Sequence, residues 1–245
     1  MAGPAAESLV QSVVRGLAHS GDPARRAHEE WYYPSAVPSF AASRDAADAA
    51  LRALRAWTKG RDDADVLDLA KRLIVARRRE TLHFAWTLID LRPAALEGIR
   101  ARDLRALEHG LDNWAAVDSF SVQVLGRAWV LGRVADGAIL RRARSRDRWI
   151  RRSALVATVP LNQKKRGGTG DARRTLAVCR LLLDDRDDMV VKAMSWALRA
   201  LSVPDPGAVR AFLDRHGDRI AARARRETLN KLRTGRKSPG RRRGM

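Results

Sequence analysis

Apolar and charged residues are interleaved along almost the whole chain of 245 residues. Alanine, leucine and arginine, all good helix formers, dominate its two long proline-free spans, 39–92 and 94–159. Valine and isoleucine do not gather in the alternating runs that half-buried strands require. The pattern predicts an all-α fold in which short helices follow one another along the chain.

Several expected helices begin with a residue that can cap free backbone N–H groups. Ser43, Asp62, Asp147 and Asp187 stand at such positions, and Asp112-Asn113 precedes the central helix. The expected helices span 6–18, 23–33, 43–58, 62–76, 78–90, 99–109, 113–130, 134–144, 147–159, 172–184, 187–202, 206–214 and 217–232.

The helices suggest a degenerate repeat rather than a single bundle. Pairs are expected to begin near 62, 99, 134 and 172, a period close to the roughly 40 residues of HEAT-type units. Arg146–Ile150 and Arg186–Val190 are similar repeat starts. We predict a HEAT-like helical-repeat solenoid with a concave basic groove, formed as a single domain over 1–233.

The charge changes this picture. Lys and Arg number 48 against 28 Asp and Glu, a formal net charge of +20. A field of that sign attracts polyanions, so nucleic acid is the leading partner and an anionic membrane surface the second. The excess of arginine over lysine favours bidentate phosphate contacts, although a GC-rich coding bias would produce the same ratio.

Cysteine and histidine usage excludes several classes of site. The one cysteine, Cys179, lies in an apolar helical run, which predicts a buried thiol and excludes a disulfide framework. The five histidines are scattered without metal-ligand spacing. We therefore expect no metal site, and a monomer is the default expectation. No signal peptide and no apolar run long enough to span a bilayer is found, which predicts a cytoplasmic, nucleoid-associated protein without a membrane partner.

Two segments differ from the helical pattern. Residues 162–171 form a basic, glycine-rich stretch, expected to be a flexible loop, that lacks the residue order of a phosphate-cradling P-loop. Its cations Lys164, Lys165 and Arg166 are candidate DNA contacts. The tail 234–245 is rich in Lys, Arg, Gly and Pro and is expected to be disordered when free. For both segments, a solvated surface role is an equally good interpretation.

Tryptophans flanked by cations are a further signal. Arg148 and Arg152 lie one helical turn apart around Trp149, and Lys192, Trp196 and Arg199 share one face at i, i+4 and i+7. In a nucleic-acid groove the cations bind phosphates, while an indole stacks on a base or sugar. A single tryptophan is more often a core residue, and that is our prediction for Trp57, Trp86 and Trp129.

Trp114 and Asp118 lie four residues apart at the start of the central helix, so they project from the same face. A carboxylate on a basic surface repels phosphate, and a salt bridge to a neighbouring arginine is its simplest explanation. The other explanation is chemistry that develops positive charge. N-glycosidic bond cleavage does so, because the sugar passes through an oxocarbenium-like state that a carboxylate and an indole face both stabilise.

Three segments together resemble the AlkD-type bacterial DNA alkylation-repair glycosylases, a HEAT-like-repeat family. They are Trp114-Ala-Ala-Val-Asp118, Trp149-Ile-Arg-Arg152-Ser-Ala, and Lys192-Ala-Met-Ser-Trp196-Ala-Leu-Arg199. Their order and separation also fit, apart from the additional basic loop, and the resemblance covers roughly residues 20 to 232.

The resemblance implies excision of cationic N3- or N7-alkylated purines from double-stranded DNA, without base flipping, metal or cofactor. Trp114 and Trp196 match the two tryptophans that pack on the lesion's deoxyribose, and Asp118 matches the catalytic carboxylate. Arg152 matches a DNA-contacting arginine. A family tyrosine near the N-terminus corresponds to Tyr32 or Tyr33. Because such a mechanism needs no base pocket, we hypothesise that bulky adducts are substrates as well, as for a self-resistance protein; the sequence does not choose between that role and repair of methyl lesions.

Two other classes remain open on the sequence. A non-catalytic HEAT-like nucleic-acid-binding protein would retain the basic groove, and replacement of Asp118 would leave its function intact. A protein-binding helical scaffold would show only weak DNA affinity from its bulk charge, independent of Trp114 and Trp196.

Overall fold

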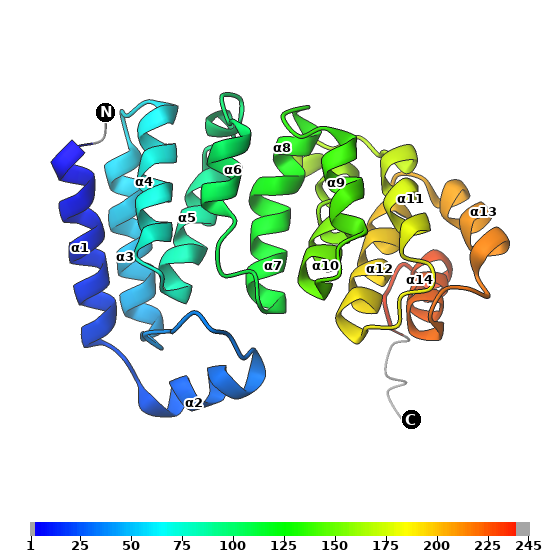
Figure 1. Cartoon of the computed structure of the whole chain (residues 1–245), viewed down its shortest axis with the longest axis horizontal. Coiled ribbons are helices and arrows are strands. Elements are labelled where there is room, and N and C mark those ends of the chain that lie inside the picture. Colours follow the sequence, from blue (N-terminus) through cyan, green and yellow to red (C-terminus); the bar gives the residue numbers. More distant parts are fainter. Residues whose placement is uncertain (1–2, 239–245) are drawn as a thin grey trace. The chain divides into compact units, whose positions relative to one another are not determined.

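The computed structural model describes residues 3–238. Over this range the chain is all-α, and its β-structure is limited to one isolated bridge between Gly21 and Ala42. The chain divides into two compact units, one up to Arg133 and the other from Val134 onward. The expected single domain over 1–233 stays a prediction. In Figure 1 the first unit runs from blue to green and the second from green to red.

The first unit consists of helix pairs with one helix of each pair in either of two layers. α1, α4 and α6 pack along one layer, and α3, α5 and α7 pack along the other. α2 lies across the ends of the upright helices and contributes no buried residue (Figure 1). The helices are α1 (Gly3–His19), α2 (Pro23–Tyr32), α3 (Arg44–Thr58), α4 (Asp63–Val75), α5 (Arg79–Leu91), the 3-10 turn Pro93–Leu96, α6 (Ala101–Leu107), α7 (Trp114–Phe120), the π-helical segment η2 (Ser121–Leu125) and α8 (Gly126–Val130).

The second unit repeats the paired arrangement. α9 packs on α10 and α11 on α12, while α10, α12 and α14 pack side by side as the second helices of their pairs. The helices are α9 (Asp136–Ala143), α10 (Arg148–Val156), the 3-10 turns Pro160–Asn162 and Lys164–Arg166, α11 (Ala172–Leu181), α12 (Asp188–Leu201), α13 (Pro206–His216) and α14 (Ala222–Thr234).

The predicted all-α, helical-repeat class is confirmed. Pairs begin at Asp63, Ala101, Asp136 and Ala172, each within two residues of its predicted start. The predicted caps form as well: the Ser43 hydroxyl accepts from the backbone N–H of Ala46, and the carboxylates of Asp62, Asp147 and Asp187 and the amide oxygen of Asn113 accept from the first turns of their own helices. The architecture therefore follows from two local features of the sequence: a capping residue at the start of these helices, and an apolar face along each helix.

The predicted helix 113–130 is continuous but changes its hydrogen-bonding pattern in the middle. α7 leads into a π-helical segment and then into α8. A π segment admits one extra residue into a turn, which shifts the faces of the residues that follow. Sequence periodicity does not reveal such a shift, because the apolar residues on either side remain compatible with one helix.

The tryptophan predictions are two-thirds right. Trp86 and Trp129 are each 1% exposed and belong to the core. Trp57, predicted to be a core residue, is only half-buried, and the guanidinium of Arg61 covers its ring at 3.9 Å from the centroid. Trp57 lies next to the last residue of α3, and Arg61, rather than an apolar side chain, packs on one face of its ring. Cys179 is fully buried as expected, and burial raises the pKa of its thiol to about 12.

The basic stretch 162–171 begins in one 3-10 turn, contains a second, and is tied to the second unit by specific contacts, while its flexibility stays a prediction. Asn162 is buried; its amide donates to the Thr158 carbonyl and the Thr175 hydroxyl, and its oxygen accepts from the Asp171 N–H. A Cβ atom on Gly168 would lie 2.0 Å from the Pro160 carbonyl oxygen, so only glycine permits this close approach. Glycine here serves compact packing.

The tail prediction concerns residues that are mostly outside the described range. Within it, Gly235 ends α14 in the left-handed conformation, and Lys237 lies 3.7 Å from Glu227; residues 239–245 are not described. No helix in 3–238 is long and apolar enough to cross a membrane. No group of three His, Cys, Asp or Glu side chains in the same range is arranged to hold a metal ion.

Candidate nucleic-acid and catalytic site

The start of α7 presents Trp114 and Asp118 on one side of the helix. The side chain of Asn113 accepts a hydrogen bond from the Ala116 N–H and fixes the first turn. Val117 and Phe120 are fully buried and anchor the adjoining face, whereas Trp114 and Asp118 are half-buried. The π-helical segment begins three residues after Asp118. Such segments occur frequently at functional sites.

Trp114 lies in a cluster of aromatic side chains from the end of α2. The ring centroids of Tyr32 and Tyr33 are 5.6 and 6.1 Å from that of Trp114, and both rings stand edge-on to the indole. Tyr32 also stacks on His28, with Trp31 next to both. The structure thus brings the two predicted N-terminal tyrosines to the predicted catalytic tryptophan, although about 80 residues separate them in sequence.

Asp112 holds this cluster together. Its carboxylate accepts hydrogen bonds from the Ser35 hydroxyl at 2.7 Å and from the Ala36 N–H at 2.6 Å. It thereby joins the chain that leaves α2 to the residue pair that begins α7. The backbone at Gly110 packs closely against Val37, because a Cβ atom on residue 110 would lie 2.7 Å from a methyl group of Val37. The positioning role of Asp112 was not predicted, since its partners are far away in sequence.

Two charged residues at the start of α5 complete the attachment. Glu80 accepts from the Ser39 hydroxyl and the Phe40 N–H, at 2.9 and 3.2 Å. Arg79 donates to the Tyr33 carbonyl, lies 3.5 Å from the Glu29 carboxylate and places its guanidinium over the Tyr33 ring. Burial, and then the nearby Glu29, raise the pKa of Tyr33, so its hydroxyl is protonated at neutral pH.

The indole N–H of the core residue Trp86 is used differently from those of Trp114 and Trp196. In Trp86 the N–H donates to the Leu107 carbonyl at 2.9 Å, as a buried donor should. Neither Trp114 nor Trp196 makes an indole hydrogen bond to any residue in 3–238, and both are half-buried. An aromatic face with an unused donor beside it suits contact with a ligand outside the chain.

In the second unit the arginines of α10 bind other parts of the same unit. Arg151 lies 2.7 Å from the Asp185 carboxylate, and Arg148 lies 3.6 Å from Asp187. Arg152 is 5% exposed and donates to the Met189 carbonyl. These contacts join α10 to the turn before α12 and to its first residues. The DNA contacts predicted for Arg148 and Arg152 stay predictions.

The second candidate face lies on α12 and contains Lys192, Trp196 and Arg199. Lys192 forms an ion pair with Asp188 at 2.6 Å. The Arg199 Nε donates to the Ser195 hydroxyl, which in turn donates to the buried Glu227 carboxylate at 2.6 Å. Burial lowers the pKa of Arg199. The side chains of this face are therefore held in position by α12 itself and by α14.

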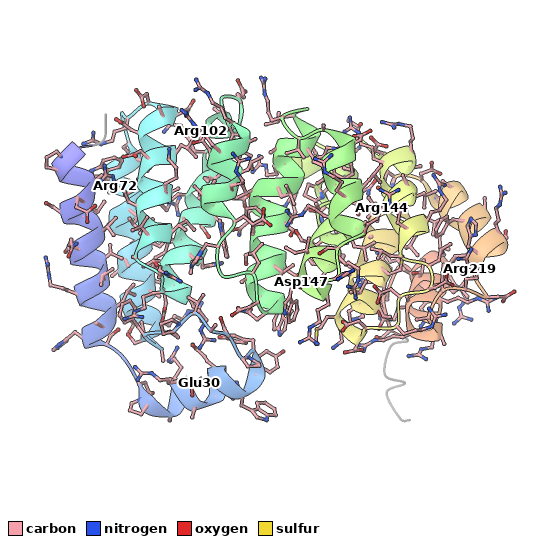
Figure 2. The ribbon with its side chains drawn as sticks, in the orientation of Figure 1. Glu30, Arg72, Arg102, Arg144, Asp147 and Arg219 are labelled. Carbon is pink, nitrogen blue, oxygen red and sulfur yellow. The ribbon has the colours of Figure 1, made fainter. Side chains whose placement is uncertain are left out.

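The remaining predicted cations lie in the 3-10 turn 164–166. Lys164 and Lys165 are exposed, and Arg166 is half-buried. Other charged side chains, such as Arg102, Arg144 and Arg219, are exposed as well and are labelled in Figure 2. Positive charge is not evenly divided: residues up to 133 contain 19 Lys and Arg against 17 Asp and Glu, whereas residues from 134 onward contain 29 against 11.

A comparison with protein families gives the decisive finding. A family model described as DNA alkylation repair enzyme matches residues 13–232. The chain belongs to this family. The match includes every predicted site residue from Tyr32 to Arg199. A comparison with curated proteins finds no match. The chain is thus a DNA alkylation repair enzyme, and its substrate is DNA.

Proposed function

We propose that this repair enzyme is a DNA glycosylase that removes cationic N3- or N7-alkylated purines from duplex DNA by hydrolysing the N-glycosidic bond. The observation that carries this proposal is the arrangement on α7: a half-buried indole with an unused N–H, two tyrosines edge-on to it, and a carboxylate one turn away. The family membership supports the choice of lesion.

Asp118 is the proposed catalytic carboxylate. The alkylated purine leaves with the electron pair of the glycosidic bond, which neutralises its positive charge and leaves an oxocarbenium-like deoxyribose. The carboxylate stabilises that cation electrostatically and orients a water molecule that adds to C1′, with the water proton passing to solvent. Removal of one such electrostatic stabiliser typically lowers a rate by about 10²- to 10³-fold.

Trp114 is proposed to pack on the deoxyribose of the lesion, where its electron-rich face also favours the developing cation. Tyr32 and Tyr33 hold the indole upright and extend the contact surface. Trp196 is assigned the same kind of contact from the second unit, on the strength of the resemblance. The duplex phosphates are bound mainly by the second unit, with Arg148, Arg152, Lys192, Arg199, Lys164, Lys165 and Arg166 as candidates.

A mechanism without base flipping is part of the proposal. Binding from the backbone side imposes no size limit on the base, so bulky adducts as well as methyl lesions would be processed. A role in self-resistance to a DNA-alkylating compound would follow from the bulky class. We propose that no metal or cofactor takes part, and that the enzyme acts as a monomer at the nucleoid.

The test is a single-turnover assay on duplex DNA that carries one N7-methylguanine, with alkali-induced strand breaks reporting abasic sites. We expect the wild type to exceed the spontaneous depurination rate and Asp118→Asn to return towards it while still binding the duplex. Asp48→Asn, an exposed carboxylate on α3, is the matched control and should retain full activity.

The alternative is a non-catalytic nucleic-acid-binding protein of the same fold. It predicts tight duplex binding, no rate above the spontaneous one on N7-methylguanine or on a bulky N3-adenine adduct, and no effect of Asp118→Asn. That combination of results would replace the glycosylase proposal.

A further inference from the structure

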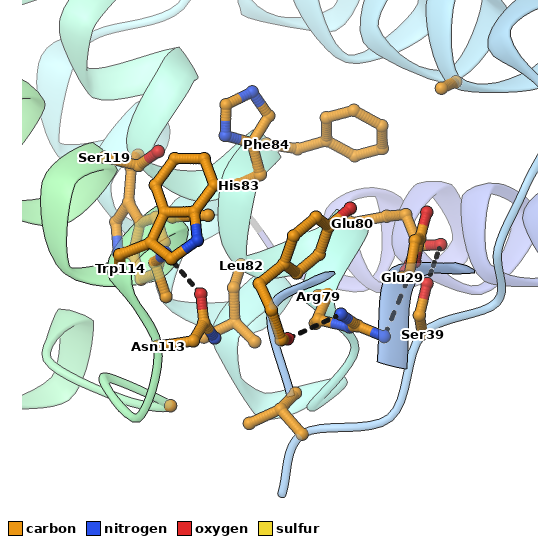
Figure 3. Close-up of a pocket in the computed structure, with 17 residues that line it drawn as sticks. Glu29, Ser39, Arg79, Glu80, Leu82, His83, Phe84, Asn113, Trp114 and Ser119 are labelled. Atoms are coloured by element: carbon orange, nitrogen blue, oxygen red, sulfur yellow. Dashed lines mark hydrogen bonds and ion pairs between the residues drawn. The ribbon is translucent and has the colours of Figure 1, made fainter. Parts of the chain in front are cut away.

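A cavity of about 430 Å³ lies beside Trp114 within the first unit. It is bounded by α2, α3, α5 and α7 (Figure 3). His83 projects from the middle of the packed helix α5, and its side chain borders this space. The volume falls within the range of about 300–1,000 Å³ typical of sites for drug-sized ligands.

Five of the 17 residues that line the cavity carry an aromatic or imidazole ring. Tyr33, Phe84, Trp86 and Trp114 line it together with the imidazole of His83. The small side chains of Ala47, Ala115 and Ala116 lie on the same lining, and they leave the space between these rings open. Aromatic rings around a gap bind a flat ring system by stacked and edge-on contacts better than they bind a branched or flexible chain.

The charged groups on the lining are already engaged. Arg79 pairs with Glu29, and the Glu80 carboxylate accepts from Ser39 and Phe40. Figure 3 shows Glu29, Arg79 and Glu80 gathered with Ser39 on one side of the view, and Asn113, Trp114 and Ser119 on the other. A charged ligand would have to displace one of these contacts, so the lining favours a neutral one.

Three polar groups of the lining make no hydrogen bond with any residue in 3–238. They are the imidazole of His83, the indole N–H of Trp114 and the hydroxyl of Ser119. Desolvation lowers the pKa of His83, which keeps the ring neutral at pH 7 and able to donate from one nitrogen and accept at the other. A few convergent polar groups in an apolar lining are what fixes the orientation of a bound small molecule.

We propose that this cavity is a binding site for a neutral, fused-ring aromatic group of drug size that carries one or two hydrogen-bonding substituents. A single purine base would leave much of the volume empty, and an anionic group would find no available cation. Trp114 forms part of the wall and also stands edge-on to Tyr32 and Tyr33. An occupant therefore touches the same indole that we assign to the lesion.

The inference is tested by equilibrium binding of N-phenyl-1-naphthylamine, a neutral aromatic probe, followed by its fluorescence. Ala47→Phe fills the cavity from α3 and is expected to weaken binding at least tenfold. Ala49→Phe, two residues along the same helix and exposed, is the matched control and should bind as the wild type does. Equal binding by wild type and Ala47→Phe would overturn the proposal.

A second filling variant guards against misfolding of the first. His83→Trp enlarges a ring that already borders the cavity and should weaken the probe as Ala47→Phe does, with far-ultraviolet circular dichroism confirming the folded state. Unchanged binding in His83→Trp would count against the site. Displacement of the probe by free 3-methyladenine at similar concentration would contradict the proposed size class and assign the cavity to a released base.

Duplex binding distinguishes the two sources of the aromatic group, which are a bulky lesion and a free molecule. Among these experiments, only this one rests on the proposed function. If the group belongs to a bulky lesion, Ala47→Phe weakens binding of a duplex with a fused-ring adduct and leaves an N7-methylguanine duplex unaffected. If the two duplexes are bound alike, the ligand is a free molecule. Because neither readout is excision, a chain that binds the probe but lacks glycosylase activity would refute only the proposed function.

Discussion

The two units surround the half-buried tryptophans Trp114 and Trp196 with different chemistry. Trp114 stands among aromatic rings, with carboxylates that hold the backbone around it by hydrogen bonds. Trp196 lies on a helix whose neighbouring polar side chains form a network of ion pairs and hydrogen bonds reaching α14. The first arrangement suits contact with a sugar or ring, whereas the second suits the fixing of cations near a polyanion.

The distribution of charge follows the same division. Acidic and basic residues nearly balance up to residue 133, and almost all of the excess positive charge lies beyond it. Even there, Arg148, Arg151 and Arg152 bind acceptors within their own unit. A high arginine count therefore overstates the number of cations available to DNA, and exposed ones such as Lys164 and Lys165 carry more weight in a phosphate-binding argument.

Replacing each tryptophan in turn tests the difference between the two units most directly. Trp114→Ala should lower the single-turnover excision rate about 10- to 100-fold, since one stacking interaction contributes roughly 1–3 kcal/mol. Its affinity for undamaged duplex should remain within about twofold, because phosphate contacts dominate that affinity. Trp196→Ala should lower excision by a similar or smaller factor, and Trp57→Ala should leave both quantities unchanged.

The measurement is single-turnover kinetics together with fluorescence-anisotropy titration of an undamaged duplex. If Trp114→Ala reduced the affinity for undamaged DNA and the rate in the same proportion, the first unit would be a binding surface rather than the site of chemistry. If Trp57→Ala reduced the rate as much as Trp114→Ala, both reductions would reflect general destabilisation.

A smaller effect is expected from the carboxylate that positions the aromatic cluster. Asp112→Ala removes the acceptor for the Ser35 hydroxyl and the Ala36 N–H, each typically contributing about 0.5–1.5 kcal/mol. Tyr32 and Tyr33 are then no longer held in a fixed position against Trp114, and we expect excision to fall about tenfold. Asp62→Ala, which removes the cap of α4, should destabilise that helix without the same fall in rate.

The readout that separates positioning from stability is the rate at saturating enzyme, measured well below the melting temperature of each variant. A reduced rate in Asp112→Ala that recovers at lower temperature would indicate local unfolding only. Retention of the full rate would show that the cluster does not depend on this tether.

The sequence predicts the helices well, because caps and apolar faces are local signals. It also predicts Trp86 and Trp129 as core residues. In the structure, Trp114, Asp118, Arg152 and Trp196 lie on the second helices of their pairs. The sequence does not predict contacts between residues that are far apart along the chain. Nothing near Asp112 indicates that its carboxylate binds residues 35 and 36, and the buried backbone contacts of Gly168 have no signal in a stretch that reads as a basic linker.

Exposed lysines of the second unit test whether its excess positive charge contributes to DNA binding. Lys164→Gln combined with Lys165→Gln should weaken duplex binding by a few fold and reduce the slope of log affinity against log salt by about one for each phosphate that the variant no longer binds. Arg102→Gln, an exposed cation of the first unit, should change the slope by much less. Equal slopes for the two variants would mean that the charge division between units has no bearing on DNA binding.

The smallest effect concerns the acid stability of the second unit. Burial alone would raise the pKa of Glu227, but hydrogen bonds from Ser195 and Arg223 outweigh it and hold the pKa below the ordinary 4.5. A lowered pKa means that the carboxylate stabilises the fold above about pH 4.5 and loses this contribution as the pH falls through the folded value. Glu227→Gln should thus cost about 1 kcal/mol at pH 7.

Thermal melts of wild type and Glu227→Gln from pH 7 to pH 3 provide the measurement. The gap in melting temperature should be a few degrees at neutral pH and should narrow below about pH 4.5, because the wild type is then protonated as well. Glu97→Gln, an exposed residue of the first unit, should show no gap at either pH. A gap that stays constant to pH 3 would mean that Glu227 contributes through packing, and the network around Trp196 would then owe its rigidity to shape rather than to charge.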